Sequence, residues 1–388
     1  MSTPRIYYLD HLRIGSILLV LIFHNARFFD RFGYWDLKAG STSLPLSLLV
    51  IFVFPWIMPL IFAVSGAAAG LSLQKRSAAV YIQDRIKRLI VPYLFVSLTF
   101  NFIQGYIVSL KRGFYQGDFL HFLPWFVERR PLSLTFSAIG MYGLHLWFLV
   151  DLFIFSLLAI PLFRALDAAK IRENAFLRKI LDLVVRFPSL CLALAGIIIQ
   201  MTLHARYADF AGFADVLFWL VFFIYGFVFI RSKRIREKLR RLRALHAITG
   251  LLCCGYFALM HQRGFVLGWL SNPDHSFGFL SFQAVMALNG VVWALYLLSL
   301  AEHFLNRDTT WRQYANEAVL PFYCIHQTMV FISAYFLIDL PINPELHFAL
   351  LTVVSLILTL SAYELVIKRI GILRLGFGMS SKPKTNKT

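Results

Sequence analysis

Ten apolar stretches of roughly membrane-spanning length follow one another along this chain of 388 residues. A helix needs about 20 such residues to cross a bilayer, and a segment in the bilayer core must satisfy its backbone hydrogen bonds internally. The chain is 59% hydrophobic, more than the about 45–50% of soluble domains. We therefore predict an all-α, polytopic membrane protein with about ten transmembrane helices. The predicted spans are residues 14–30, 45–73, 89–110, 139–163, 188–204, 212–230, 244–262, 280–302, 316–338 and 347–367.

Basic residues alternate between the linkers. The two termini and four linkers hold 29 of the 38 Lys and Arg, whereas the five other linkers hold 9. Cytoplasmic loops carry such an excess of Lys and Arg, so both termini are predicted to be cytoplasmic. The protein itself is predicted to lie in the cell's inner membrane. The net charge of +18 then comes from basic linker residues that set the topology and face the lipid bilayer. No nucleic-acid partner is expected. The four basic linkers are residues 74–88, 164–186, 231–243 and 303–312.

The linkers are too short to hold a soluble domain. Residues 1–370 are predicted to form a single transmembrane domain, and residues 371–388 a basic cytoplasmic tail that is disordered at its end. The longest linker, about 111–138, could fold back onto the outer membrane surface. No Cys or His spacing is typical of a metal site, so neither a metal nor a permanently bound cofactor is expected.

Arg13 and His24 are polar residues in and beside the first apolar stretch. Eleven residues separate them, which places both on one helix face about 16 Å apart along the axis. An Arg in a spanning helix costs on the order of 2.5–3.5 kcal/mol on insertion scales, so it normally faces the protein interior or an aqueous cavity. A cation near one surface and a titratable imidazole deeper in the membrane indicate a site that is reached through the bilayer.

Three other polar residues are predicted at the depth of His24. Counting about 1.5 Å per residue from the helix ends places Ser65, Asp151 and His326 about 15–19 Å from the inner surface. Each has a structural alternative. A lone His could only hydrogen-bond a neighbour, and Asp151 could neutralise an Arg or His. Ser65 opens a run of small residues, Ser65–Gly70, whose spacing is typical of close helix packing.

Two further pairs fall nearer the membrane surfaces. His145 and Trp147 are predicted near the outer surface, where Trp is often an interface anchor but could also stack on a sugar. Arg85 and Arg88 begin the third span on the inner side, and their i, i+3 spacing puts both guanidinium groups on one face. Such a pair can grip phosphates. It could equally serve topology and anionic lipid, with Asp84 as a helix cap or a local partner of Arg88.

Four segments together resemble the acyltransferase-3 family of integral-membrane acyltransferases. The resemblance covers nearly the whole chain, and His145–Leu149 with the overall length is similar to the branch that includes the glucan biosynthesis protein C succinyltransferases. Members of other branches carry an additional C-terminal domain. The four segments are Tyr8–Arg13 with His24 in an Arg-x(10)-His pattern, Phe62–Gly66, the RxxR motif Arg85–Arg88, and Leu320–Gln327.

The resemblance implies transfer of an acyl group, acetyl or succinyl, from cytoplasmic acyl-coenzyme A to a carbohydrate hydroxyl. The acceptor would be a glucan, a polysaccharide or a lipid-linked sugar outside the cytoplasm. His24 would be the general base, with Arg13 in the catalytic site, and Arg13, Arg85 and Arg88 would bind the donor. The residues expected to support catalysis or bind the acceptor are Asn25, Ser65, His145, Trp147, Asp151, Tyr323 and His326.

Two other functions fit the same composition. A secondary transporter for a small anion or sugar also places ionisable groups at mid-membrane depth, although internal repeats and matched broken helices are not evident in this sequence. A non-catalytic membrane assembly protein would tolerate loss of His24 with effects on stability alone.

Overall fold

The computed structural model describes residues 6–32, 35–129, 142–165, 174–207, 209–271 and 273–381, and all regular structure in these ranges is helical. Within them, nine helical segments are long and apolar enough to cross a membrane, and a tenth span is possible if Arg178–Arg186 and Pro188–Leu203, which meet at 106°, count as one. The prediction of an all-α protein with about ten spans is therefore confirmed.

Except for the first and third, the helix bounds agree with the predicted spans to within a few residues where the structure describes them; the predicted start of the fourth span, residue 139, lies outside the described residues. The first was predicted at 14–30, whereas α1 covers Tyr7–Ala26. The hydropathy pattern misses its polar first turns, and the chain leaves the helix once Arg27 is reached. The third, predicted at 89–110, belongs to a longer helical segment that begins at Ala78 and ends at Lys111.

Backbone contacts divide the chain into two compact units. Unit 1 consists of Met1–Ser16, Ile51–Ile82 and Ile154–Arg312, and unit 2 consists of Ile17–Val50, Gln83–Phe153 and Gln313–Thr388. Several helices, α1 among them, contribute residues to both units.

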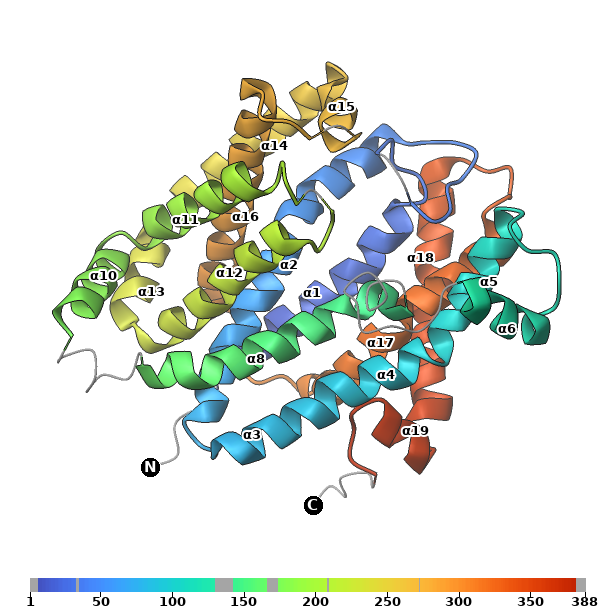
Figure 1. The fold of residues 1–388 in the computed structure, drawn as a ribbon, viewed down its shortest axis with the longest axis horizontal. Helices are drawn as coiled ribbons and strands as arrows, with labels where there is room; N and C mark the ends of the chain where they lie inside the picture. The colour runs from blue at the N-terminus through green and yellow to red at the C-terminus, as the bar shows by residue number, and fades with distance from the viewer. Residues whose placement is uncertain are drawn as a thin grey trace. The chain divides into compact units, whose positions relative to one another are not determined.

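Unit 1 is assembled by close contact between helices. Gly66 of α2 and Gly226 of α12 each lie against the backbone of the other helix, because a Cβ at Gly66 would overlap the carbonyl group of Phe223 and one at Gly226 that of Ala63. This confirms the close-packing interpretation of the small residues after Ser65. Helices α11, α14 and α16 also lie side by side (Figure 1). The helices that lie mainly in unit 1 are α2 (Leu44–Leu73), α8 (Trp147–Ala165), α10 (Ala175–Arg186), α11 (Pro188–Leu203), α12 (Phe213–Arg231), α13 (Lys233–Arg241), α14 (Arg243–Gln262), α15 (Phe265–Ser271) and α16 (Phe277–Phe304).

Unit 2 combines short helices with the long helices α17 and α18. Helices α5 and α6 lie side by side (Figure 1) and share a cluster of aromatic side chains around Phe122 and Phe126. The long linker predicted at 111–138 thus contains a packed helix, while its residues 130–138 lie outside the described residues. Helix α3 (Ala78–Arg85) is divided at residue 82, with its larger part in unit 1. The helices that lie mainly in unit 2 are η1 (Ile86–Ile90), α4 (Val91–Ser97), α5 (Phe100–Lys111), α6 (Phe119–Arg129), η2 (Leu144–Leu146), α17 (Arg312–Leu337), α18 (Pro344–Ser361), η3 (Ala362–Ile367) and α19 (Gly371–Gly376).

The predicted basic tail begins with a packed helix. Helix α19 lies against α4 (Figure 1), and the Arg374 side chain is buried. Its guanidinium group donates to Glu317 at 3.1 Å and to the carbonyl oxygens of Ser380 and Lys368 at 2.7 and 3.1 Å. Residues 382–388, the predicted disordered end, lie outside the described residues.

Candidate active site

Three histidines from distant parts of the sequence meet in unit 2. His24 lies in the last turn of α1, His326 in the middle of α17, and His145 in the short helix η2. His24 Nδ1 is 3.1 Å from His326 Nε2, and the two rings are stacked with centroids 5.1 Å apart. The His145 ring lies at 82° to that of His326, with centroids 4.9 Å apart. The structure thus brings together His24 and His326, which were predicted at one depth, and adds His145.

The hydrogen bonds of His326 determine which ring nitrogens carry protons. His326 Nδ1 is 2.6 Å from the carbonyl oxygen of Tyr323. A carbonyl oxygen only accepts, so in neutral His326 the proton is on Nδ1 and Nε2 carries a lone pair. That lone pair accepts from His24 Nδ1–H, which leaves the lone pair of neutral His24 on Nε2. His24 is half-buried, and its Nε2 has no hydrogen-bond partner among the described residues, so this atom is oriented to act as a base.

His145 is buried and fixed by main-chain atoms. Its Nε2 lies 3.0 Å from the Tyr323 carbonyl oxygen and 3.2 Å from that of Cys324, and the Tyr323 hydroxyl donates to the His145 carbonyl at 2.6 Å. Just before it, Leu144 has a φ of 48°, which costs on the order of 1–3 kcal/mol for a residue with a side chain. Asn101 of α5 donates to the carbonyls of Tyr142 and Gly143 at 2.8 and 3.0 Å and so holds this turn.

The segment after α1 returns to cover His24. The Trp35 ring lies 5.5 Å from the His24 ring, and the Arg27 guanidinium lies 5.1 Å from the Trp35 ring centroid. The Trp35 indole Nε1 is buried and has no hydrogen-bond partner among the described residues. An indole N–H can only donate, so Trp35 offers an unengaged donor beside the candidate base.

A buried carboxylate fixes this covering segment; we call Arg27, Asp30 and Lys38 the Asp30 group. Arg27 Nη1 and Lys38 Nζ each lie 3.0 Å from an Asp30 carboxylate oxygen, and the Asp30 side chain is 0% exposed. Lys38 also donates to the carbonyl oxygens of Arg27, Asp30 and Phe32 at 2.9–3.2 Å. Burial raises the pKa of the Asp30 carboxyl and lowers the pKa of Arg27 and of Lys38, and this effect outweighs the attraction among the three charges.

A second carboxylate, Asp84, contacts both arginines of the RxxR motif; we call Asp84, Arg85 and Arg88 the Asp84 group. Arg85 Nη2 lies 3.1 Å from Asp84 Oδ2, and Arg88 Nε lies 3.0 Å from Asp84 Oδ1, at i, i+4. The Arg88 side chain is 58% exposed and the Asp84 side chain 22%. The motif runs from the end of α3 into the π-helix η1. Both guanidinium groups therefore meet at one partly exposed carboxylate. The pair between Asp84 and Arg88 is the local pairing that the sequence spacing allowed.

The remaining predicted site residues of unit 2 lie around the histidines but differ in availability. The Asn25 amide donates to the carbonyl oxygen of Leu21 and to Ser355 Oγ, both at 3.0 Å, so both of its protons are engaged. Asp151 is buried in α8, within electrostatic range of Tyr323. Trp147 begins α8, half-buried, with its ring against Phe148.

Two predicted site residues belong to unit 1. Arg13 lies in the second turn of α1, the same continuous helix that carries His24, and it is half-buried. Ser65 is half-buried in α2, next to the close contact made by Gly66.

Sequence patterns give no sign of two parts of this site. Trp35 and the Asp30 group lie in an irregular segment without periodicity. The sequence does contain a signal for Asn101, because Asn101 and Gln104 are two amides at i, i+3 in a predicted span. Within the described residues, no group of three or more His, Cys, Asp or Glu side chains could hold a metal ion.

Comparison with known proteins defines the class. A family model described as "Acyltransferase domain" matches residues 6–364. The chain therefore belongs to the acyltransferase-3 family of membrane proteins, and it is an O-acyltransferase with multiple transmembrane helices. Among curated relatives, two proteins named "Glucans biosynthesis protein C", from Escherichia coli strains SMS-3-5 / SECEC and K12 / DH10B, are 24% and 23% identical over 346 residues, which is 86% of this chain and 85% of each relative. No solved structure matches the chain.

Proposed function

We propose that this protein transfers an acetyl or succinyl group from cytoplasmic acyl-coenzyme A to a hydroxyl of an envelope carbohydrate, in the cell's inner membrane, with His24 as the general base. The observation that carries the proposal is the hydrogen-bond chain from the Tyr323 carbonyl through His326 to His24. It fixes the tautomer of His24 and leaves Nε2 with a lone pair on a half-buried ring.

The reaction that this arrangement serves is a simple acyl exchange. His24 Nε2 takes the proton of the acceptor hydroxyl while the hydroxyl oxygen attacks the thioester carbonyl carbon. The tetrahedral intermediate then collapses, the carbon–sulfur bond breaks, and the coenzyme A thiolate takes the proton from the His24 imidazolium. The products are the carbohydrate ester and free coenzyme A, and His24 returns to its neutral form.

The tetrahedral intermediate carries a negative oxygen that needs hydrogen-bond donors. Asn25 and His326 are among the residues expected to support catalysis, but their protons are already donated to Leu21, Ser355 and Tyr323. Trp35 Nε1–H is unengaged and beside the base. We therefore assign the oxyanion contact to Trp35 and the orientation of His24 to His326.

The Asp84 group suits the donor phosphates. Its two guanidinium groups are partly exposed and share one carboxylate, so a phosphate can take the place of Asp84 as their partner. It lies near the start of the helical segment Ala78–Lys111, which is the predicted cytoplasmic end. The names of the curated relatives support a glucan as the carbohydrate.

The test is acyl transfer by purified protein with His24→Ala. We expect transfer to fall by about 10²–10⁴-fold, the usual contribution of a general base, with insertion and folding retained. The control is His246→Ala, since His246 is a buried histidine of unit 1 whose Nε2 lies 2.8 Å from Ser189 Oγ. Full transfer by the His24 variant, measured as acyl esters on the glycan by mass spectrometry, would contradict the proposed role.

A further inference from the structure

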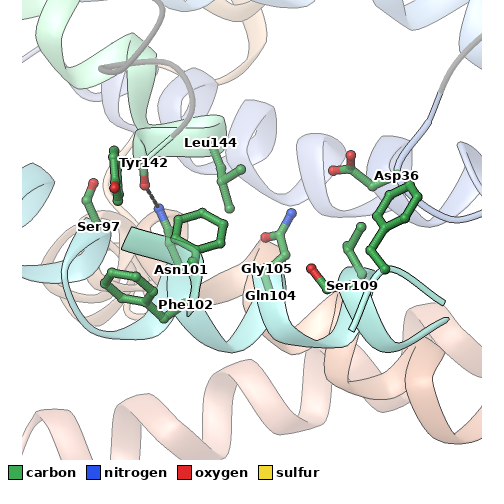
Figure 2. A pocket seen from close by; sticks show the side chains of 12 residues that line it. Asp36, Ser97, Asn101, Phe102, Gln104, Gly105, Ser109, Tyr142 and Leu144 are labelled. Atoms are coloured by element: carbon green, nitrogen blue, oxygen red, sulfur yellow. Dashed lines mark hydrogen bonds between the residues drawn. The ribbon is translucent and has the colours of Figure 1, made fainter. Parts of the chain in front are cut away.

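A cavity of about 120 Å³ lies in unit 2 along one face of α5. Asn101, Gln104, Gly105 and Val108 line it, and their spacing of three and four residues puts them on the same side of the helix. Figure 2 shows the Asn101 and Gln104 side chains rising from α5 into the pocket, with Leu144 on the opposite wall. The cavity has several times the volume that a single water molecule needs.

The pocket holds buried amide atoms that have no hydrogen-bond partner. Gln104 is 1% exposed, and neither its nitrogen nor its oxygen is bonded to any described residue. The Asn101 amide nitrogen is committed to the Tyr142 and Gly143 carbonyls, but its oxygen also has no partner there. Buried polar groups are nearly always paired in folded proteins, so these atoms point to a polar ligand.

The pocket adjoins the histidines on two sides. Leu144, on one wall, directly precedes His145, whose ring lies against His326. Asp36, on another wall, directly follows Trp35, whose ring lies against His24. A molecule in this pocket would therefore lie next to the residues that orient and cover the candidate base.

The charge of the lining decides which substrate fits. Of the described residues that line the pocket, none is Lys or Arg, and Asp36 adds a carboxylate. The lining therefore offers the phosphates of coenzyme A no cation to pair with. Amides and a carboxylate can hydrogen-bond hydroxyl groups, and the rings of Phe102, Phe126 and Tyr142 can lie against the C–H face of a sugar. The pocket also lies toward the far end of the segment Ala78–Lys111 from the Asp84 group.

We propose that this pocket is the acceptor subsite and that it binds a neutral saccharide unit, with Gln104 as its principal hydrogen-bonding residue. The assignment rests on the proposed function, because it takes the carbohydrate to be the acceptor of the acyl group. It adds the location of that acceptor and its charge class, neutral and polyhydroxylated.

Gln104→Leu tests the assignment, since it keeps the side-chain size and removes the amide. The full chain in lipid nanodiscs is titrated, without acyl donor, with glucose disaccharides that differ in linkage. We expect the dissociation constant of the best disaccharide to rise about tenfold in the variant, as for the loss of one hydrogen bond to a ligand. The matched control is Gln283→Leu, which removes a buried amide from α16 in unit 1; it should leave the affinity unchanged.

Thermal stability separates a ligand-binding residue from a structural one. Without saccharide, Gln104→Leu should melt at a temperature equal to or higher than the unchanged protein, because it removes buried polar atoms that have no partner. A lower melting temperature with unchanged disaccharide affinity would show a structural amide and would overturn the proposal. Failure of the unchanged protein to bind any of the disaccharides would overturn it as well.

A cysteine in the pocket gives a second measurement. Gly105→Cys should be tolerated, because a Cβ there would be 3.6 Å or more from the nearest ring atoms, those of Phe126 and Phe122. We expect the disaccharide to slow its reaction with a thiol reagent and acyl-coenzyme A to leave the rate unchanged. Protection by acyl-coenzyme A alone would make this pocket a donor site and would overturn the proposal.

The subsite and the proposed function fail in different ways. Disaccharide binding that depends on Gln104, without any acyl transfer, would contradict the proposed function and keep the subsite. Acyl transfer with an unchanged acceptor KM in Gln104→Leu would keep the function and contradict the subsite.

Discussion

Unit 2 contains two groups with the same three charges, each with one aspartate that pairs with two cations, and they differ in burial. In the Asp30 group the carboxylate side chain is 0% exposed, and in the Asp84 group it is 22% exposed. The first holds a loop over His24 through three additional carbonyl contacts of Lys38. The second has partly exposed guanidinium groups. The same three charges thus build a fixed support in one place and, in the function proposed above, an exchangeable anion site in the other.

The comparison shows why a motif alone does not reveal a role. A buried ion pair cannot exchange its partner without exposing an uncompensated charge to a low-dielectric interior. A partly exposed pair loses little when its carboxylate is replaced by a phosphate, because solvent already screens it. Burial therefore decides whether the cations serve the fold or the substrate.

The largest expected effect separates the two groups by stability. Asp30→Ala should lower the free energy of unfolding by about 3–5 kcal/mol, because it leaves Arg27 and Lys38 without their carboxylate. Asp84→Ala should change it by less than about 1 kcal/mol. Thermal or denaturant unfolding in a mild detergent measures both, and equal losses would remove the distinction between the groups.

The next effect concerns what the Asp30 group holds in place. Trp35→Phe keeps a ring against His24 but removes the indole donor, so kcat should fall by about 10²–10³-fold. The KM values of donor and acceptor should change little. Trp125→Phe, at a half-buried position of α6 in unit 2, is the control. A Trp35 variant with undiminished kcat would leave the oxyanion contact to another donor.

A smaller effect is expected at the exposed group. Arg85→Ala and Arg88→Ala should each raise the KM for acyl-coenzyme A by roughly 10- to 100-fold, because a charge-assisted phosphate contact contributes about 1.5–3 kcal/mol. The acceptor KM should not move. Lys87 is exposed and lies between the two arginines in the sequence. Lys87→Ala is therefore the control, which shows whether any local cation suffices. An unchanged donor KM in both arginine variants would assign them to topology and lipid contact.

The smallest effect has the opposite sign. Asp84→Asn removes the carboxylate that competes with phosphate for the two guanidinium groups, so the KM for acyl-coenzyme A should fall by a few-fold while stability stays within about 1 kcal/mol. Steady-state kinetics at fixed acceptor concentration measures it. A raised KM would mean that Asp84 orients the arginines for the donor and does not compete with it.

Most of the fold follows from the sequence because the bilayer leaves the chain few choices. Hydropathy alone locates the spans, and the small residues after Ser65 predict the contact that Gly66 makes with α12. Hydropathy misplaces the start of α1, because Asp10 and Arg13 are polar yet belong to the helix.

The site follows from the sequence only where helix geometry governs it. Counting residues along helices placed His24 and His326 at one depth, and the structure joins them by a hydrogen bond. The same counting does not bring His145 to them, because it cannot foresee a turn with Leu144 in the left-handed region. Trp35 and the Asp30 group were beyond prediction, since a loop folded by ion pairs and carbonyl contacts leaves no periodic pattern.

The Tyr323 carbonyl oxygen, which accepts from both His326 and His145, has a consequence for genetics. Every amino acid supplies a main-chain carbonyl oxygen, so no codon change at position 323 deletes it. A library that replaces each side chain in turn would detect His24 and His326 and pass over the atom that sets their tautomers. Replacing the amide between residues 323 and 324 with an ester, by incorporating a hydroxy acid, would weaken that acceptor while every side chain stays in place.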